Sequence, residues 1–167
     1  MRKILVGVLA ATMITAHAHS QVSGEGGPIR VKADKSEVLD KDRKVILSNN
    51  VDITQGDARL RADKVVLAYA GTGAAGSGMT GFGDIDTMTA TGDVFYVTTD
   101  LKATGDVGVY DATADTITLR GNVVLLRGED VAKGERLVMQ LAAGRTTLDG
   151  GSSQVTMVIT PSENSGR

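Results

Sequence analysis

The sequence has no cysteine and no tryptophan, and histidine and aromatic residues are scarce. Without cysteine, the chain cannot form a disulfide framework, a thiolate metal site or a cysteine nucleophile. Its two histidines, His17 and His19, both lie close to the N-terminus, so almost nothing is available for a Ser-His-Asp triad or a histidine-rich metal site. These absences argue against an enzyme, and we expect no cofactor and no metal.

Charge and aromatic content also argue against a nucleic-acid partner. The chain carries 18 Lys+Arg against 20 Asp+Glu, a formal net charge of −2, so bulk charge cannot hold a polyanion. Three tyrosines and two phenylalanines are too few to build the stacking platforms that bind single strands. We therefore expect no nucleic acid among the partners.

The N-terminus has the layout of a secretory signal peptide. Arg2 and Lys3 precede the apolar run 4–11, and Ala16-His17-Ala18 forms an A-x-A cleavage site. We predict that residues 1–18 are a signal peptide cleaved after Ala18 and that the product is exported. The net charge of the chain then changes from −2 to −4, because two basic residues leave with the signal. The alternative is an uncleaved membrane anchor.

An internal repeat follows. Acidic residues recur in similar contexts at positions 34, 63, 106 and 135, with gaps of 29, 43 and 29 residues. The longer middle gap contains the glycine-rich segment 71–83, which we interpret as an inserted loop. Gly71 to Gly76 matches the G-x-G-x-x-G pattern, but no helix follows it, so nucleotide binding is not expected.

Within each repeat, apolar and polar residues alternate with the period of a half-buried strand. Turn signals at 40–42, 55–57, 111–113 and 143–144 separate these strands. The parity of the apolar positions flips at each acid: Leu60 and Ala62 precede Asp63, whereas Val65 and Leu67 follow it. Such a flip requires a bulge or a corner. We therefore predict an all-β fold, an open twisted β-jelly roll of antiparallel strands built from repeats of 29 residues.

The charged residues of the repeats have an ordinary interpretation. The corner acids and the pair Asp84 and Asp86 could be cation ligands, but turn-capping acids explain them better. Basic residues alternate on the polar face around Arg30 and Lys32, and again around Arg59 and Arg61. A solvated outer face is the default reading, and a site for anionic head groups is the alternative.

The apolar face of the strands is built almost entirely of aliphatic residues. Such a face normally fills a core, but in an open sheet it also forms a seam that suits acyl chains. The predicted groove residues are Ile29, Val31, Val45, Leu47, Val51, Ile53, Leu60, Val65, Leu67, Val94, Ile117, Leu119, Val123, Leu125, Leu137 and Met139.

Several short motifs resemble one known family. They are the run 49–57 leading into 60–66, the opening segment 28–34, the blocks 121–123 and 134–136, and the closing segment 155–162. In this order they resemble the OstA-like (LptA) family of periplasmic lipopolysaccharide export proteins. The resemblance covers about residues 28–162, which we take as the domain. Residues 19–27 are then a flexible N-terminal segment, and residues 163–167 are a disordered tail.

The resemblance implies a periplasmic β-jelly roll whose groove shelters the acyl chains of lipid A, with Ile29 and Val31 as the groove residues carried over most directly. It also implies head-to-tail self-assembly through the edges that hold Ile29, Val31, Val155, Met157 and Ile159. The resulting bridge would join an inner-membrane LptC-like protein to an outer-membrane LptD-like translocon. Regular alternation without proline in 29–33 and 155–159 is consistent with adhesive edges.

Two alternatives remain open from the sequence. The first is a membrane-anchored LptC-like partner of the same system, which would keep its N-terminal helix. The second is a structural periplasmic β-filament that binds no lipid.

Overall fold

The computed structural model describes residues 27–69 and 85–161. The predicted signal peptide 1–18, almost all of the segment 19–27, the glycine-rich loop 71–83, Asp84 and the tail 163–167 lie outside the described residues. The assignments made for them, and the domain boundaries that depend on them, stay predictions.

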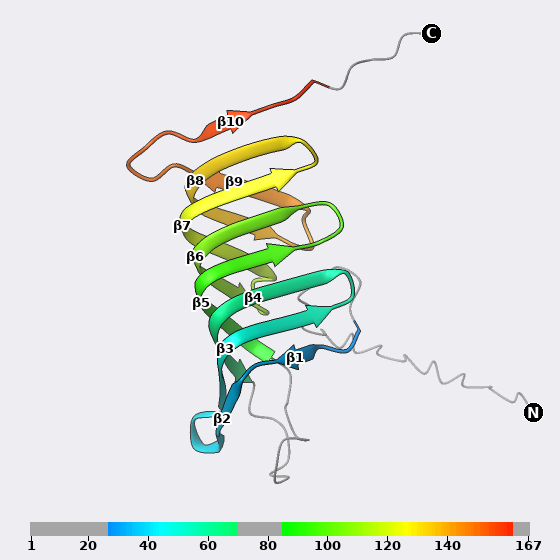
Figure 1. The fold of residues 1–167 in the computed structure, drawn as a ribbon, viewed down its shortest axis with the longest axis vertical. Coiled ribbons are helices and arrows are strands. Elements are labelled where there is room, and N and C mark those ends of the chain that lie inside the picture. The colour runs from blue at the N-terminus through cyan, green and yellow to red at the C-terminus, as the bar shows by residue number, and fades with distance from the viewer. Residues whose placement is uncertain (1–26, 70–84, 162–167) are drawn as a thin grey trace, which may run out of the picture.

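The described residues form ten antiparallel strands and one short 3₁₀ turn at Asp40–Asp42. The strands are β1 (Arg30–Lys32), β2 (Lys35–Leu39), β3 (Lys44–Gln55), β4 (Ala58–Tyr69), β5 (Ile85–Val97), β6 (Lys102–Asp111), β7 (Thr116–Arg127), β8 (Asp130–Gln140), β9 (Arg145–Asp149) and β10 (Thr156–Val158). Hairpins stack one upon the next in chain order, with β1 and β2 at one end and β9 and β10 at the other (Figure 1). The predicted all-β, open jelly roll is confirmed.

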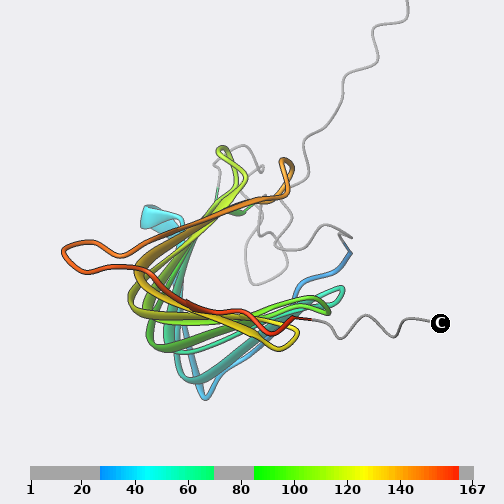
Figure 2. The same ribbon diagram turned by 90° about the horizontal axis from the view of Figure 1, so that it is seen from above.

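Every long strand is bent near its middle, so that the molecule has a V-shaped cross-section (Figure 2). Half of each long strand belongs to one arm of the V, which begins with β2 and ends with β9. The other half belongs to the second arm, which begins with β1 and ends with β10. We call these the β2–β9 arm and the β1–β10 arm.

The bends fall at the predicted parity flips. The strand register shifts between Ser48 and Val51 in the β3–β4 pair, and equivalent shifts occur in each long pair up to β7–β8. At each bend, two residues of one strand oppose a single acid on its neighbour, which is the residue count of a β-bulge. The bulge bends the pair of strands. The strand that carries the single acid changes parity there, which explains the sequence pattern, whereas the two corner residues of β3 leave Leu47 and Val51 in the same parity.

The paired bulge residues adopt left-handed backbone conformations. They are Asn49 (φ 64°) and Asn50 (φ 51°) on β3, Gly92 (φ 79°) and Asp93 (φ 43°) on β5, and Gly121 (φ 76°) and Asn122 (φ 49°) on β7. Glycine, asparagine and aspartate are the residues that tolerate this region at least cost. We call each such pair a left-handed corner and each opposing position an acid corner.

Acid and left-handed corners are joined by hydrogen bonds and close packing. The Asn50 side-chain amide donates to Oδ2 of Asp34 at 2.7 Å, and Asn122 donates to Asp106 in the same way at 2.9 Å. A Cβ atom added at Gly92 would overlap the Asp63 carboxylate, and one at Gly121 would overlap that of Asp106. The glycines are therefore required twice, for their backbone conformation and for the space that the acid occupies.

The interior of the V is one hydrophobic core. Residues that face each other in an antiparallel pair project to the same side of the sheet, so the inner face consists of continuous rows. In the β2–β9 arm, one row runs through Leu47, Val65, Ala90, Gly108, Leu119, Leu137 and Leu148. In the β1–β10 arm, another runs through Val31, Ile53, Leu60, Tyr96, Ala103, Leu125, Ala132 and Met157.

None of the described residues belongs to a helix with the length and apolar character needed to cross a membrane.

The corner geometry makes a test of stability. Gly92→Ala should destabilise the fold by about 1–3 kcal/mol more than Gly128→Ala. Both positions have a left-handed backbone, with φ of 79° and 59°, but a Cβ atom meets Asp63 at Gly92 and nothing within 4 Å at Gly128. Urea denaturation of the two variants measures the difference, and equal losses would show that packing against Asp63 is unimportant.

Candidate functional site

The inner face of the V is where the sequence placed its binding residues. All sixteen predicted groove positions lie on this face, but they differ in exposure. Twelve are buried in the core, namely Val45, Leu47, Val51, Ile53, Leu60, Val65, Val94, Ile117, Leu119, Val123, Leu137 and Met139. Ile29, Leu67 and Leu125 are partly buried against it. Val31 is exposed at the end of the sheet.

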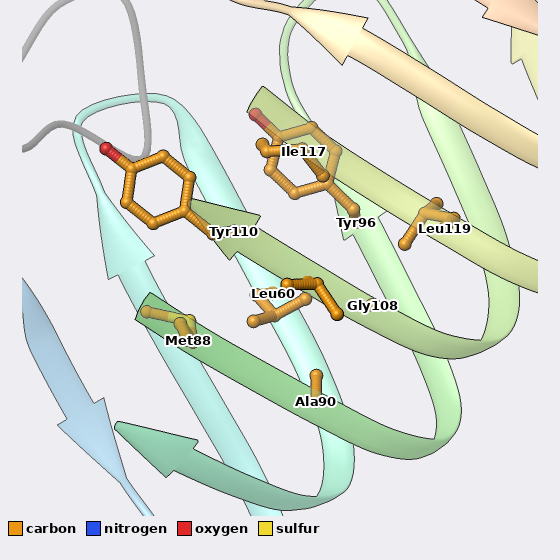
Figure 3. A pocket seen from close by; sticks show the side chains of 9 residues that line it. Leu60, Met88, Ala90, Tyr96, Gly108, Tyr110, Ile117 and Leu119 are labelled. Atoms are coloured by element: carbon orange, nitrogen blue, oxygen red, sulfur yellow. The ribbon is translucent and has the colours of Figure 1, made fainter. Parts of the chain in front are cut away.

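The core contains a hollow midway along the stack. Leu60 and Tyr96 of the β1–β10 arm line it together with Met88, Ala90, Gly108, Val109, Tyr110, Ile117 and Leu119 of the β2–β9 arm. Ala90 and Gly108 pair directly across β5 and β6, so two small residues meet where the rest of the wall carries larger side chains (Figure 3). A Cβ atom added at Gly108 would lie 3.0 Å from Leu119 Cδ2 and 3.1 Å from Val94 Cγ1, so neighbouring side chains already pack over this glycine.

The free space in the hollow is about 20 Å³, which is room for about one water molecule. An acyl chain can enter only if the two arms move apart. The arms are joined along the bend, and the opposite side of the V is rimmed by hairpin turns such as Gly56-Asp57 and the 112–115 turn. In the described residues, the two ends of the sheet do not pair to close it into a barrel. The arms can therefore separate without the loss of a backbone ladder.

Six lining residues were absent from the sequence-based groove set: Gly108, Val109 and the four residues Met88, Ala90, Tyr96 and Tyr110. All four are buried, and burial, with a smaller contribution from Asp57, raises the pKa of Tyr96 to about 12. The phenol therefore stays neutral at physiological pH. Met88, Ala90 and Tyr96 share the parity of Val94, so the alternation that identified Val94 on β5 also selects the other three. The signal for these residues was therefore present in the sequence.

The outer face carries the charged residues. Arg59 donates from Nε to Oδ1 of Asp52 at 2.9 Å, and its Nη2 forms a second bond to Oδ2. Lys32 and Arg61 flank Asp52 on the two neighbouring strands. The hydrogen bond from Arg59 holds the pKa of Asp52 below its usual value, with smaller contributions from the charges of Arg59, Arg61 and Lys32. The polar face predicted around these basic residues is thus the outside of the β1–β10 arm.

The carboxylates of the described residues do not gather into a metal site. No three acids or other ligating side chains lie together within the described ranges, and the corner acids are spread along the bend, one to a corner. Asp34 and Asp106 accept hydrogen bonds from the side chains of corner asparagines on the neighbouring strand.

The predicted assembly residues lie at the two ends of the stack. β1 pairs only with β3, and β10 pairs only with β8, among the strands that the structure describes. Val31 is 40% exposed, Met157 is 61% exposed and Ile159 is 65% exposed, and Val155 is also exposed. Ile29 is partly buried against the core. The sequence analysis did not select Val158 of β10, which is exposed on the outer side.

The Asp52–Arg59 pair predicts a pH dependence. Arg59→Ala should raise the pKa of Asp52 toward 3.8 and lower the stability of the fold at neutral pH. Because the folded-state pKa is depressed, this stabilisation exists above the unfolded-state pKa and disappears as pH falls through the folded-state pKa. The effect should be modest, since both side chains contact solvent. NMR titration of the Asp52 carboxyl carbon measures it. Arg61→Ala is the control and should shift the pKa less; an equal shift would contradict the assignment to the hydrogen bond.

The chain and its fold have recognisable relatives. An uncharacterized protein of Rhizobium meliloti (strain 1021), R00383, is 31% identical over 168 residues, which cover 95% of this chain and 89% of that protein. The crystal structure of LptH from Pseudomonas aeruginosa has a TM-score of 0.66 at 23% identity, covering 80% of this chain and 96% of that chain. LptH is described as the LptA homologous periplasmic component of the conserved lipopolysaccharide transport device, and the likeness shows that the two proteins share a fold.

The family resemblance seen in the sequence motifs is also confirmed. The family described as "LptA/(LptD N-terminal domain) LPS transport protein" matches residues 30–145, from the first strand to the start of β9. Because this match spans more than half of the sequence, the chain belongs to the LptA/(LptD N-terminal domain) family of LPS transport proteins.

Proposed function

We propose that the protein is a periplasmic, non-enzymatic carrier of lipopolysaccharide that shelters the acyl chains of lipid A between the two arms of the V. The observation that carries the proposal is the continuous apolar inner face, which runs the length of the stack and ends in exposed Val31 and Met157. Family membership supports the lipid class. The predicted signal peptide supports the periplasmic location.

The chemistry of the interior suits acyl chains and little else. Among the described residues, its buried side chains are aliphatic or small, apart from two tyrosines and Gln55. Each methylene transferred from water to such a face contributes about 0.8 kcal/mol. Part of this gain is spent on separating the packed arms, since the hollow alone is too small for a chain. Binding should therefore be moderate in strength, which suits a carrier that must also release its lipid.

The edges support assembly. We propose that the C-terminal edge of one copy pairs with the N-terminal edge of the next, so that the apolar face continues from copy to copy. Contacts of this heterologous kind propagate as a filament. The same two edges would serve the partners at the ends of the bridge, an inner-membrane LptC-like protein and an outer-membrane LptD-like translocon.

The two alternatives make different predictions. An uncleaved N-terminus in the membrane fraction, shown by mass spectrometry with Met1 intact, would favour the anchored LptC-like protein. Assembly without any lipid binding would favour the structural filament, whose packed interior needs no occupant.

Site-specific photocrosslinking tests the carrier. With a photoreactive phenylalanine at Tyr96 or Val31, lipopolysaccharide should be captured, because both positions are on the inner face. Phe95 and Lys32 are the matched controls, since each is the chain neighbour of a test position and faces outward. Phe95 is also aromatic, so the substitution changes its size little.

Capture is read by denaturing electrophoresis and detection of lipopolysaccharide. Phe95 and Lys32 variants should give at least about tenfold less adduct, because outward positions contact no buried lipid. Equal capture at Tyr96 and Phe95 would rule out the interior as the binding site.

A further inference from the structure

The corners of the sheet alternate strictly, and the two ends of the molecule present opposite kinds. Acid corners lie at Asp34, Asp63, Asp106 and Glu135, and left-handed corners lie on the strands between them. At the N-terminal end the last corner is the acid corner Asp34, between β1 and β2. At the C-terminal end the last corner is left-handed, because Gly151 there has φ 63° and packs on Glu135.

Each end of the sheet is one bent strand divided into two pieces. On β8, Arg136 pairs with Arg120 on one side and with Asp149 of β9 on the other, and Lys133 pairs with Val124 and with Thr156 of β10. β9 and β10 therefore occupy the place of a single strand with a left-handed corner. The segment 150–154 connects them where an interior corner has two residues, and this loop projects from the outside of the bend (Figure 2).

β1 and β2 likewise occupy the place of one strand with an acid corner. On β3, Asp52 pairs with Lys32 of β1, and Ser48 pairs with Lys35 of β2. The same two β3 residues pair with Arg61 and Lys64 on either side of the acid corner Asp63. In the described residues, both arms are consequently unpaired at both ends of the molecule.

We infer that adjacent copies join through both arms at once, with β10 and β9 of one copy pairing with β1 and β2 of the next in a single register set by the corners. The inference rests on the proposed head-to-tail assembly and specifies it. Inside the sheet, the residue after a left-handed corner faces the residue before an acid corner, as Val123 faces Gly134. The residue before a left-handed corner faces the residue after an acid corner, as Arg120 faces Arg136.

Applied to the ends, this rule fixes the contacts between copies. In the β1–β10 arm, Met157 of one copy faces Val31 of the next, so two exposed apolar side chains cover each other on the inner side. In the β2–β9 arm, Asp149 faces Lys35, which places opposite charges in a direct cross-strand pair. Thr147 then faces Glu37 on the outer side. The register thus agrees with side-chain chemistry that was not used to derive it.

Symmetric contacts do not satisfy these conditions. Two N-terminal edges centred on Val31 would place Lys32 opposite Arg30, a like-charge pair that is destabilising, and would bring two acid corners together. Two C-terminal edges would bring two left-handed corners together, whereas every left-handed corner in the sheet is flanked by acid corners. The polarity of the assembly is therefore built into the corners.

Disulfide mapping tests the register, because the chain has no cysteine of its own. The full chain carrying Met157→Cys is mixed with a second preparation carrying Ile29→Cys, Val31→Cys, Lys32→Cys or Ala33→Cys, and the mixture is oxidised gently. We expect the Val31→Cys partner to form the intermolecular disulfide at least about tenfold faster than the others, since only directly facing residues bring their Cβ atoms within bonding range. Thr147→Cys with Glu37→Cys tests the second arm and should also crosslink.

The outcomes separate this inference from the proposed function. Fastest crosslinking at Ile29 or Ala33 would overturn the register while leaving head-to-tail assembly intact. Preferential Val31–Val31 or Met157–Met157 disulfides would overturn the polarity, and a crosslink in only one arm would overturn the two-arm contact.

Lipopolysaccharide capture at Tyr96 is measured on the same preparations. Loss of that capture with the predicted disulfides intact would count against the carrier and not against the register. Circular dichroism of each variant, expected to match the parent, checks that the substitutions, including those at partly buried Ile29 and Ala33, leave the fold unchanged.

Discussion

The bend in each long strand is the constraint on which the rest of the structure depends. A strand with period-two alternation shows one face to the core along its whole length, and at each bend a two-residue left-handed corner lies opposite a single acid. The strand that carries the acid changes parity at the bend, whereas the strand that carries the two-residue corner keeps it. The acid occupies the space that a side chain would need at Gly92 or Gly121. Because a bend recurs in register on every long strand, the bends align into one continuous edge, and both arms keep their backbone hydrogen bonds.

That edge also explains why the interior is apolar and almost completely packed. The two inner faces meet at the bend and pack against each other, so most of the aliphatic residues there are buried. A small hollow remains midway along the stack, with Ala90 and Gly108 among its lining residues. A V joined on one side can open at the other with the loss of apolar packing alone. A closed barrel of the same composition would have to break strand pairing to admit a chain of similar size.

Much of this arrangement could be predicted from residues in the sequence. The spacing of Asp63 and Asp106 among alternating apolar residues predicted strands, corners and the face of every proposed groove residue. The sequence did not predict the division of that face into buried, partly buried and exposed positions, because burial depends on how closely the two arms approach. It also did not predict that Tyr96 and Tyr110 line the hollow. Spacing along the chain does not show which positions converge across the V.

The sequence by itself determined that the chain is an alternating β protein with repeated corners, poor in reactive side chains and similar to lipopolysaccharide export proteins. These properties are local: they follow from residue type, spacing and the backbone preferences of glycine and asparagine. Only the tertiary structure decided that the corners align into one edge, that the interior is packed, and that the two ends of the stack carry opposite corners on unpaired strands. Those properties depend on which strands become neighbours. Pairing between residues far apart in the chain, such as β8 with both β7 and β10, is settled when the whole sheet assembles.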